Sequence, residues 1–131
     1  MYIEACNGRE VLGCSRVGDM YYEGVGIAKN IYRAFEIESK GCGMDPIFCL
    51  IQGDKYRIGP HRLQDYMKAS LLYQSGCDAM WGGACFELAE MYYKGQGLRQ
   101  SKIDALKYYG RACDLRLQSG CDEYAKLNTS K

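Results

Sequence analysis

The chain has 131 residues, a formal net charge of +1 and eight cysteines, with 47% hydrophobic and 25% charged residues. This length and composition are typical of one compact unit. The charge balance lacks the basic excess that nucleic-acid binding usually requires, and no apolar run is long enough for a membrane span. We therefore expect neither a nucleic-acid partner nor a membrane span.

The even cysteine count, several times ordinary usage, favours a disulfide framework made in an oxidising compartment. The first residues lack the basic start and apolar stretch of a secretory signal peptide. We therefore expect a mature or excised piece of a protein, or a chain exported by another route.

The chain repeats itself with a period of 35 to 36 residues, which is typical of a helical solenoid. Residues 1–13 match the end of a repeat, residues 14–48, 49–84 and 85–120 form three copies, and residues 121–131 begin a fourth that stops after one short helix. Each copy shares a series of landmarks, which in the first copy are Cys14, Gly18, Asp19, Tyr21, Gly24, Ala34 and Cys42.

Each copy predicts two helices joined by a turn. Cys14, Val17, Gly18 and Tyr21 have the i, i+3, i+4, i+7 spacing of one helical stripe. Glycines then end this first helix, and a second amphipathic stretch begins near Ile31. Two such helices cannot bury both apolar stripes alone, so we expect the copies to stack into an all-α solenoid of antiparallel helix pairs that forms a single repeat domain.

A small residue follows each first-helix cysteine by four positions: Gly18, Gly53, Ala89 and Ala125. We expect larger side chains there to clash with a neighbouring helix. The second copy departs from the pattern at three positions, namely Gln52 in the apolar stripe, Arg57 in place of a tyrosine and His61 in place of a turn glycine. Pro60 lies in the turn between the helices, where its fixed φ is harmless.

The cysteines fall in pairs, one at the end of a second helix and one at the start of the next first helix. The repeat therefore predicts four disulfides across tight connections: Cys6–Cys14, Cys42–Cys49, Cys77–Cys85 and Cys113–Cys121. Cys42 and Cys49 are seven residues apart and the other pairs eight, which leaves the pairing of these two cysteines open. Buried structural thiols are the alternative interpretation. Because C-x-x-C is absent and His61 is the only histidine, we expect no metal and no cofactor.

Three segments, Leu88–Gly97, Lys107–Tyr109 and Arg111–Leu115, together with the period, resemble Sel1-like repeats. The paired cysteines are similar to those of the Helicobacter cysteine-rich protein subfamily. The resemblance implies a right-handed α/α superhelix related to tetratricopeptide repeats, with each helix pair locked by a disulfide to its neighbour. It also implies a secreted or periplasmic bacterial protein, and members of the subfamily are described as penicillin-binding proteins or slow β-lactamases. A cytochrome c oxidase assembly factor of the mitochondrial intermembrane space shares such repeats, which makes that compartment the alternative location.

The sequence itself contains no recognisable catalytic motif. S-x-x-K and G-x-S-x-G are absent, and a single histidine cannot supply the ligands of a metal-dependent hydrolase. Catalytic residues are therefore unassigned, and a β-lactam or a peptidoglycan-like small molecule is expected as a ligand only through the resemblance.

Acidic residues recur in one register of the first helices, off the apolar stripe: Asp19, Asp54 and Glu90, flanked by Tyr22, Arg57 and Tyr93. The fourth copy has Lys126 there. Because first helices usually line the concave face of such a solenoid, we expect a column of carboxylates and rings that grips an extended, partly basic peptide. An ordinary solvated face is the alternative. The function predicted from the sequence is thus a scaffold that binds a protein or peptide, and the alternative function is a weak β-lactam-binding protein or hydrolase.

Overall fold

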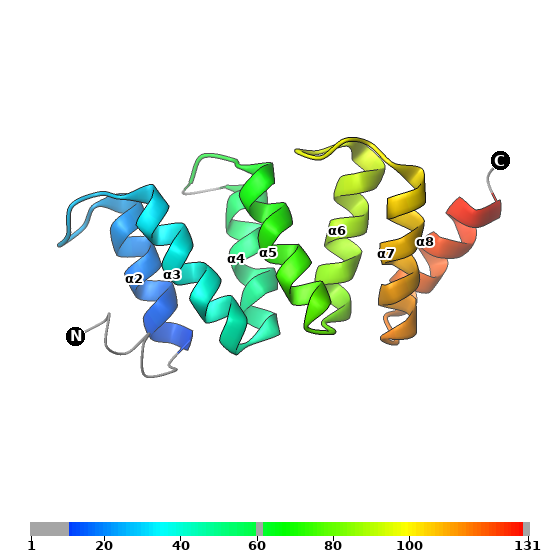
Figure 1. Ribbon diagram of the computed structural model, residues 1–131, viewed down its shortest axis with the longest axis horizontal. Helices are drawn as coiled ribbons and strands as arrows, with labels where there is room; N and C mark the ends of the chain where they lie inside the picture. The colour runs from blue at the N-terminus through cyan, green and yellow to red at the C-terminus, as the bar shows by residue number, and fades with distance from the viewer. Residues whose placement is uncertain (1–10, 60–61, 130–131) are drawn as a thin grey trace.

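The computed structural model describes residues 11–59 and 62–129. Within these ranges the chain forms seven helices and no strand (Figure 1), namely α2 (Val11–Glu23), α3 (Ile31–Met44), α4 (Pro46–Ile58), α5 (Tyr66–Asp78), α6 (Gly82–Lys94), α7 (Lys102–Asp114) and α8 (Gln118–Thr129).

The helices stand side by side in a row, with α2 and α8 at opposite ends (Figure 1). Helix α2 packs against α3, α4 against α5, and α6 against α7, while α8 packs against α7. The predicted all-α solenoid of antiparallel helix pairs is therefore confirmed. We call the side formed by α2, α4, α6 and α8 the A-helix face, and the side formed by α3, α5 and α7 the B-helix face.

The turns inside the pairs begin and end in the same way, because the same residue types recur at both positions. Gly24, Gly59 and Gly95 adopt the left-handed conformation that ends the preceding helix, with φ of 74°, 63° and 70°. The next helix begins at an N-cap whose side chain accepts a backbone N–H, supplied by Asn30, Asp65 and Ser101 in α3, α5 and α7. The predictions for Pro60 and His61 lie outside the described residues.

Disulfides close the tight connections between consecutive pairs. The Cα atoms are 4.5 Å apart in each of the three bridges that the described residues form: Cys42–Cys49, Cys77–Cys85 and Cys113–Cys121. Cys14 is also disulfide-bonded, and Cys6, its predicted partner, lies outside the described residues.

The seven-residue spacing of Cys42 and Cys49 reflects a shorter connection between α3 and α4. The longer connections each contain one residue with a left-handed backbone, Met80 before α6 and Arg116 before α8, with φ of 68° and 69°. Between α3 and α4 only Asp45 intervenes, in an extended conformation. A disulfide therefore forms across both the shorter and the longer kind of connection, with the same separation of its Cα atoms.

The core is one continuous cluster between the A and B helices, and its largest buried side chains include Tyr56, Tyr73, Tyr109, Leu72, Leu88 and Met91. Gln52, which occupies a stripe position, is fully buried, and both polar atoms of its amide lack a hydrogen-bond partner among the described residues. Val17 and Leu88 hold the equivalent positions in α2 and α6.

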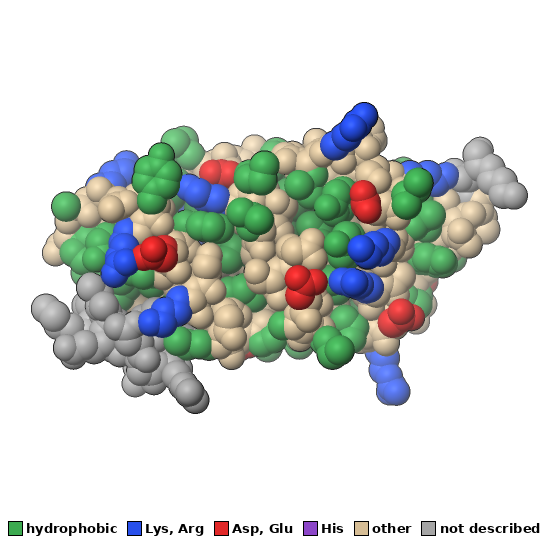
Figure 2. Space-filling view, in the orientation of Figure 1, with side chains coloured by type: hydrophobic (Ala, Val, Ile, Leu, Met, Phe, Trp, Pro, Cys, Tyr) green, Lys and Arg blue, Asp and Glu red, His purple; other side chains and the backbone are tan. Residues whose placement is uncertain are grey.

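The B-helix face, shown in Figure 2, carries hydrophobic side chains interspersed with charged ones. Its exposed apolar residues include Tyr32, Met67, Leu71 and Ile103. Across the described residues, no helix combines the length and the apolar character needed to cross a membrane.

Candidate functional site

Where two consecutive A helices meet, side chains of the A-helix face converge with one residue of the intervening B helix. There are three such junctions: α2/α4 with α3, α4/α6 with α5, and α6/α8 with α7. The acidic register predicted from the sequence contributes Asp19, Asp54 and Glu90 to these junctions in turn.

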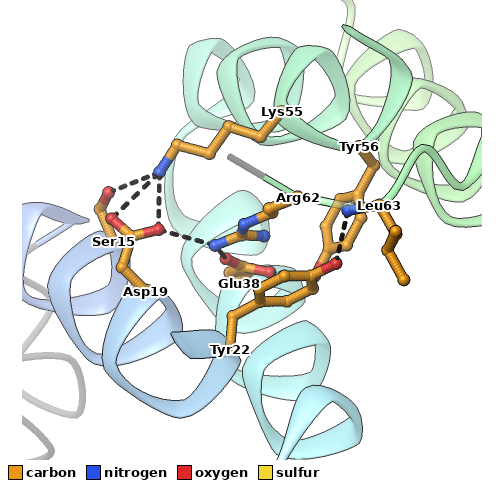
Figure 3. Close-up of polar contacts among 8 residues, drawn as sticks. All are labelled: Ser15, Asp19, Tyr22, Glu38, Lys55, Tyr56, Arg62 and Leu63. Carbon is orange, nitrogen blue, oxygen red and sulfur yellow. Dashed lines mark hydrogen bonds and ion pairs between the residues drawn. The ribbon is translucent and has the colours of Figure 1, made fainter. Parts of the chain in front are cut away.

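In the first junction, Arg62 reaches back from the turn after α4 and lies between two acids and two rings (Figure 3). Its Nη2 donates to Asp19 Oδ1 at 2.7 Å and to Glu38 Oε2 at 2.5 Å. Its guanidinium carbon is 4.5 Å from the ring centroid of Tyr22 and 4.9 Å from that of Tyr56. The side chains of Arg62 and Glu38 are 5% and 0% exposed, so this is a buried, stacked ion pair.

The charges of this buried group act on one another. Burial opposes the charged form of Arg62, but the hydrogen bond to Glu38 and the charge of Glu38 raise the pKa of Arg62 above its ordinary value. Tyr56 donates its hydroxyl to Glu38 Oε1 at 2.5 Å. Burial, followed by the charge of Glu38, raises the pKa of Tyr56 as well, which keeps that hydroxyl protonated.

Lys55 links the same junction directly across α2 and α4 (Figure 3). Its Nζ donates to Ser15 Oγ at 3.2 Å and approaches Asp19 Oδ1 at 3.3 Å. The hydroxyl of Tyr22 accepts the backbone N–H of Leu63 at 2.9 Å, which fixes the turn that carries Arg62.

In the second junction, Arg57 supplies the guanidinium from α4 itself. Its Nε donates to the Tyr73 hydroxyl at 2.9 Å, and its Nη2 lies 3.5 Å from Asp54 Oδ1 and 3.6 Å from Glu87 Oε2. Tyr73 in turn donates to Asp54 at 2.5 Å. Burial and the hydrogen bond to Asp54 raise the pKa of Tyr73, and burial raises the pKa of Glu87 against the opposing charge of Arg57.

The third junction contains an open pocket of about 210 Å³, lined by Tyr93, Tyr109, Glu123, Lys126 and Leu127. Tyr109 donates to Glu90 Oε1 at 2.9 Å. Burial raises the pKa of Tyr109, and the hydrogen bond to Glu90 and the charges of Glu90 and Glu123 raise it further. Both carboxylates therefore lie close to one tyrosine hydroxyl at the pocket.

The structure changes the interpretation of the acidic column. The sequence predicts that Asp19, Asp54 and Glu90 are carboxylates available to a partner. Each of them is instead bonded within the chain, to a tyrosine or arginine and to a lysine or arginine of the same face. Lys126, at the same register of α8, pairs with Glu123 at 3.4 Å.

The sequence analysis did not identify Glu38, Arg62, Lys55 or Ser15 as site residues. A signal for two of them was present in the repeat register. Glu38 aligns with Tyr73 and Tyr109, and Arg62 aligns with the apolar Ile27 and Leu98. An acid and a base therefore depart from the pattern together, which is typical of a buried ion pair.

Within residues 11–59 and 62–129, no group of three or more histidine, cysteine, aspartate or glutamate side chains is placed to hold a metal ion. The acids Asp19, Asp54 and Glu90 of the junctions are instead bonded to tyrosine, arginine and lysine side chains.

Solved structures with the same fold come from several bacteria. A Sel1 repeat protein from Oxalobacter formigenes superposes with a TM-score of 0.67 and 17% identity, and the match covers 95% of this chain and 95% of the Oxalobacter chain. A protective antigen with an SLR fold from uropathogenic Escherichia coli strains matches 99% of the chain and 28% of that antigen, with a TM-score of 0.71 and 23% identity. These two likenesses show the fold. Helicobacter pylori cysteine-rich protein B superposes with a TM-score of 0.61 and 27% identity, and the match covers 92% of this chain and 87% of the Helicobacter chain.

At the level of sequence, an uncharacterized protein of Haemophilus influenzae is 58% identical over 31 residues, which are 24% of this chain and 60% of that protein's length. The Sel1 repeat matches residues 11–37 and 83–117, the first and third copies of the period. The helical pairs, the disulfides between them and these matches agree, and the chain is a Sel1 repeat protein.

Proposed function

We propose that this Sel1-repeat scaffold binds a protein or peptide partner on its A-helix face, which would be the concave face of the solenoid. The pocket of the third junction is the observation that carries this proposal. It opens on this face and combines an aromatic ring, a carboxylate and an apolar side chain, and its Tyr93 is 48% exposed.

The charges of the face favour an extended and partly basic partner. The ion pairs of Asp19 with Lys55 and of Glu90 with Lys94 are partly exposed, and such pairs contribute little to stability. A basic group of a partner can therefore replace the lysine at small cost, while the carboxylate keeps its tyrosine or arginine contact. Aromatic anchors beside such acids are typical of binding hot spots.

The test is binding of fluorescent ten-residue peptides of graded net charge, measured by anisotropy. The variant Asp19→Asn, Asp54→Asn, Glu90→Gln should bind the basic peptides at least tenfold more weakly than the parent chain. Three exposed acids of α3, α5 and α7 give a matched control in which the same charge is removed from the B-helix face: Glu36→Gln, Asp78→Asn and Asp114→Asn. Circular dichroism of both variants separates lost binding from lost folding. The proposal fails if no peptide of the set binds, or if the two variants bind equally.

A second candidate, a β-lactam-binding or β-lactam-hydrolysing protein, is favoured by one contact. Ser15 Oγ lies 3.2 Å from Lys55 Nζ, although the two residues are 40 positions apart, so the fold creates a serine–lysine pair that no S-x-x-K motif announces. In the structure Lys55 donates this hydrogen bond and is also ion-paired with Asp19. To act as the base that activates Ser15, Lys55 would have to lose that proton and leave Asp19.

Intact-mass measurement before and after exposure to benzylpenicillin tests this second candidate. Attack of Ser15 Oγ on the lactam carbonyl breaks the ring C–N bond and moves the hydroxyl proton to the ring nitrogen, so the adduct carries the whole mass of the β-lactam. An adduct that disappears in Ser15→Ala, together with turnover of a chromogenic cephalosporin, would establish it. An unchanged mass would contradict the second candidate, and the scaffold function would then be the only one of the two that remains.

The disulfides are typical of an oxidising compartment. We place the protein outside the cytoplasm, in the periplasm or secreted, because the solved proteins that it resembles are bacterial. The mitochondrial intermembrane space is the alternative. Mass spectrometry of cell fractions under thiol-blocking conditions would distinguish the compartments.

A further inference from the structure

We infer that the pocket between α6, α7 and α8 binds an arginine side chain of the partner. This inference rests on the proposed scaffold function and names the chemistry that one of its sites recognises. The chain itself binds a guanidinium group at each of the other two junctions.

The second junction shows the arrangement that holds a guanidinium group. Arg57 is bound there by an acid of α4, a tyrosine of α5 and a glutamate of α6, at the distances given above: Asp54, Tyr73 and Glu87. The tyrosine also donates to the acid, so these two members of the set are fixed before the guanidinium is counted.

The third junction contains the same set one repeat later. Moving each of these three residues by 36 positions gives Glu90, Tyr109 and Glu123. Tyr109 again donates to the acid, at 2.9 Å, and the charge of Glu123 acts on the same hydroxyl. The position equivalent to Arg57 is Tyr93, and among the described residues no arginine lines the pocket.

Tyr93 does not make the pocket unsuitable for a guanidinium group. Its equivalent in the first junction is Tyr22, and there the guanidinium of Arg62 stacks on the ring at 4.5 Å while it donates to Asp19. Asp19 is the equivalent of Glu90. The third junction thus unites the acid–tyrosine–glutamate set of the second junction with the stacking ring of the first.

Lysines with mostly exposed side chains pair with the two carboxylates of the third junction, and one of them, Lys126, lines the pocket. Lys94 lies 3.3 Å from Glu90 and Lys126 lies 3.4 Å from Glu123, and their side chains are 55% and 74% exposed. Such pairs are weak, and a planar guanidinium donates to carboxylates in a fork that an ammonium group cannot match. The pocket should therefore prefer arginine to lysine in the partner.

The probe is the pentapeptide acetyl-Gly-Gly-Arg-Gly-Gly-amide, titrated into the isotope-labelled protein and followed by two-dimensional NMR. Its lysine and citrulline analogues separate the guanidinium shape from the charge. We expect shifts that centre on α6 to α8, and binding of the arginine peptide at least fivefold tighter than that of lysine and tenfold tighter than that of citrulline. Glu123→Gln and Tyr93→Ala should each weaken it at least fivefold, and the remote control Glu36→Gln should leave it unchanged.

A further variant, Tyr93→Arg, tests the precedent directly. Its side chain should enter the pocket as Arg57 does in the second junction, abolish binding of the arginine pentapeptide and raise the melting temperature. Binding that survives in Tyr93→Arg would overturn the inference. Equal affinity for citrulline, shifts elsewhere on the protein, or no shifts would also overturn it.

Two further outcomes separate this inference from the proposed function. If extended peptides bind the A-helix face without any preference for arginine, the arginine site is contradicted and the scaffold function is supported. If the pentapeptide binds in the pocket while none of the ten-residue peptides binds, the arginine site is supported and the extended-peptide function is contradicted. Without peptide, the NMR signals of the pocket residues could shift with protein concentration. Such shifts would identify a second copy of the chain as the occupant and would overturn the assignment to a partner.

Discussion

At Gly53 the chain has no room for a side chain, because the helix-B tyrosine of the same repeat lies against the backbone. A Cβ placed there would be 2.5 Å from Tyr73 Cε1, and at Gly18 a Cβ would be 2.6 Å from Glu38 Oε2. Tyr73 is buried and bonded to both Asp54 and Arg57, so its ring cannot move aside without breaking those contacts.

We predict that Gly53→Ala lowers the free energy of unfolding by about 1 to 3 kcal/mol, as is usual for overpacking of a core. Urea unfolding measures it. Gly43→Ala is the matched control, since a Cβ at this exposed position of α3 would meet nothing within 4 Å. Alanine there should be neutral or slightly stabilising because of its helix propensity. Equal behaviour of the two variants would contradict the steric explanation.

The sequence predicts that the side chain four positions after each first-helix cysteine must be small, but it does not show the reason. The period alone identified Gly18, Gly53, Ala89 and Ala125 as one set. The neighbours of Gly18 and Gly53 are side chains of the paired helix, and these differ between the two repeats, so the cause required the structure. In the fourth copy the expectation does not apply, because Ala125 is exposed.

At the scale of the elements, the turn after α4 is tied to the preceding helix pair by the buried contact of Arg62 with Glu38. Removing one partner of a buried ion pair leaves the other charge without compensation. We therefore predict that Arg62→Leu lowers the free energy of unfolding by about 3 to 5 kcal/mol, measured by urea unfolding.

The double variant Glu38→Tyr, Arg62→Leu supplies the control for this prediction. It installs the residues that the third repeat already has, Tyr109 and Leu98. It should recover most of the stability that the single variant loses, because no unpaired charge remains and an apolar side chain fills the turn. A double variant as unstable as Arg62→Leu would show that the loss has another cause.

Helices and disulfides were predictable because their signals are local. The glycine turns and the 3.6-residue period mark the helix ends, and the cysteine pairs flank short connections. The ion pairs of the A-helix face were not predictable in the same way. Arg62 contacts residues of the preceding repeat, 24 and 43 positions away, so reading each repeat by itself hides the pairing.

At the scale of the whole molecule, the bridges between consecutive pairs restrain a row of helices that contact mainly their neighbours. Closing loops of this length contributes about 2 to 3 kcal/mol per bridge, and the described bridges together are comparable with the roughly 5 to 15 kcal/mol of a typical domain. We predict that full reduction leaves the protein only marginally folded, seen as a large drop in melting temperature with reductant. An unchanged melting curve, with thiol titration proving reduction, would contradict this prediction.

The tyrosine hydroxyls that bind the junction acids also determine how the molecule responds to alkali. Tyr56, Tyr73 and Tyr109, one from each junction, have pKa values raised mainly by burial. The folded chain therefore retains three protons that the unfolded chain releases near pH 10. Stability is complete below that pH and falls above it, by about 1.4 kcal/mol per pH unit for each tyrosine.

Urea unfolding at pH 9, 10 and 11 measures this dependence. Tyr73→Phe should reduce the slope against pH by about one third, and Tyr32→Phe, at an exposed position of α3, should not change it. A pH-independent midpoint up to pH 11 would contradict the linkage. If the linkage holds, a solenoid whose repeats are otherwise joined only to their neighbours loses its stability to alkali at all three junctions in the same pH range, because unfolding releases one tyrosine proton from each junction.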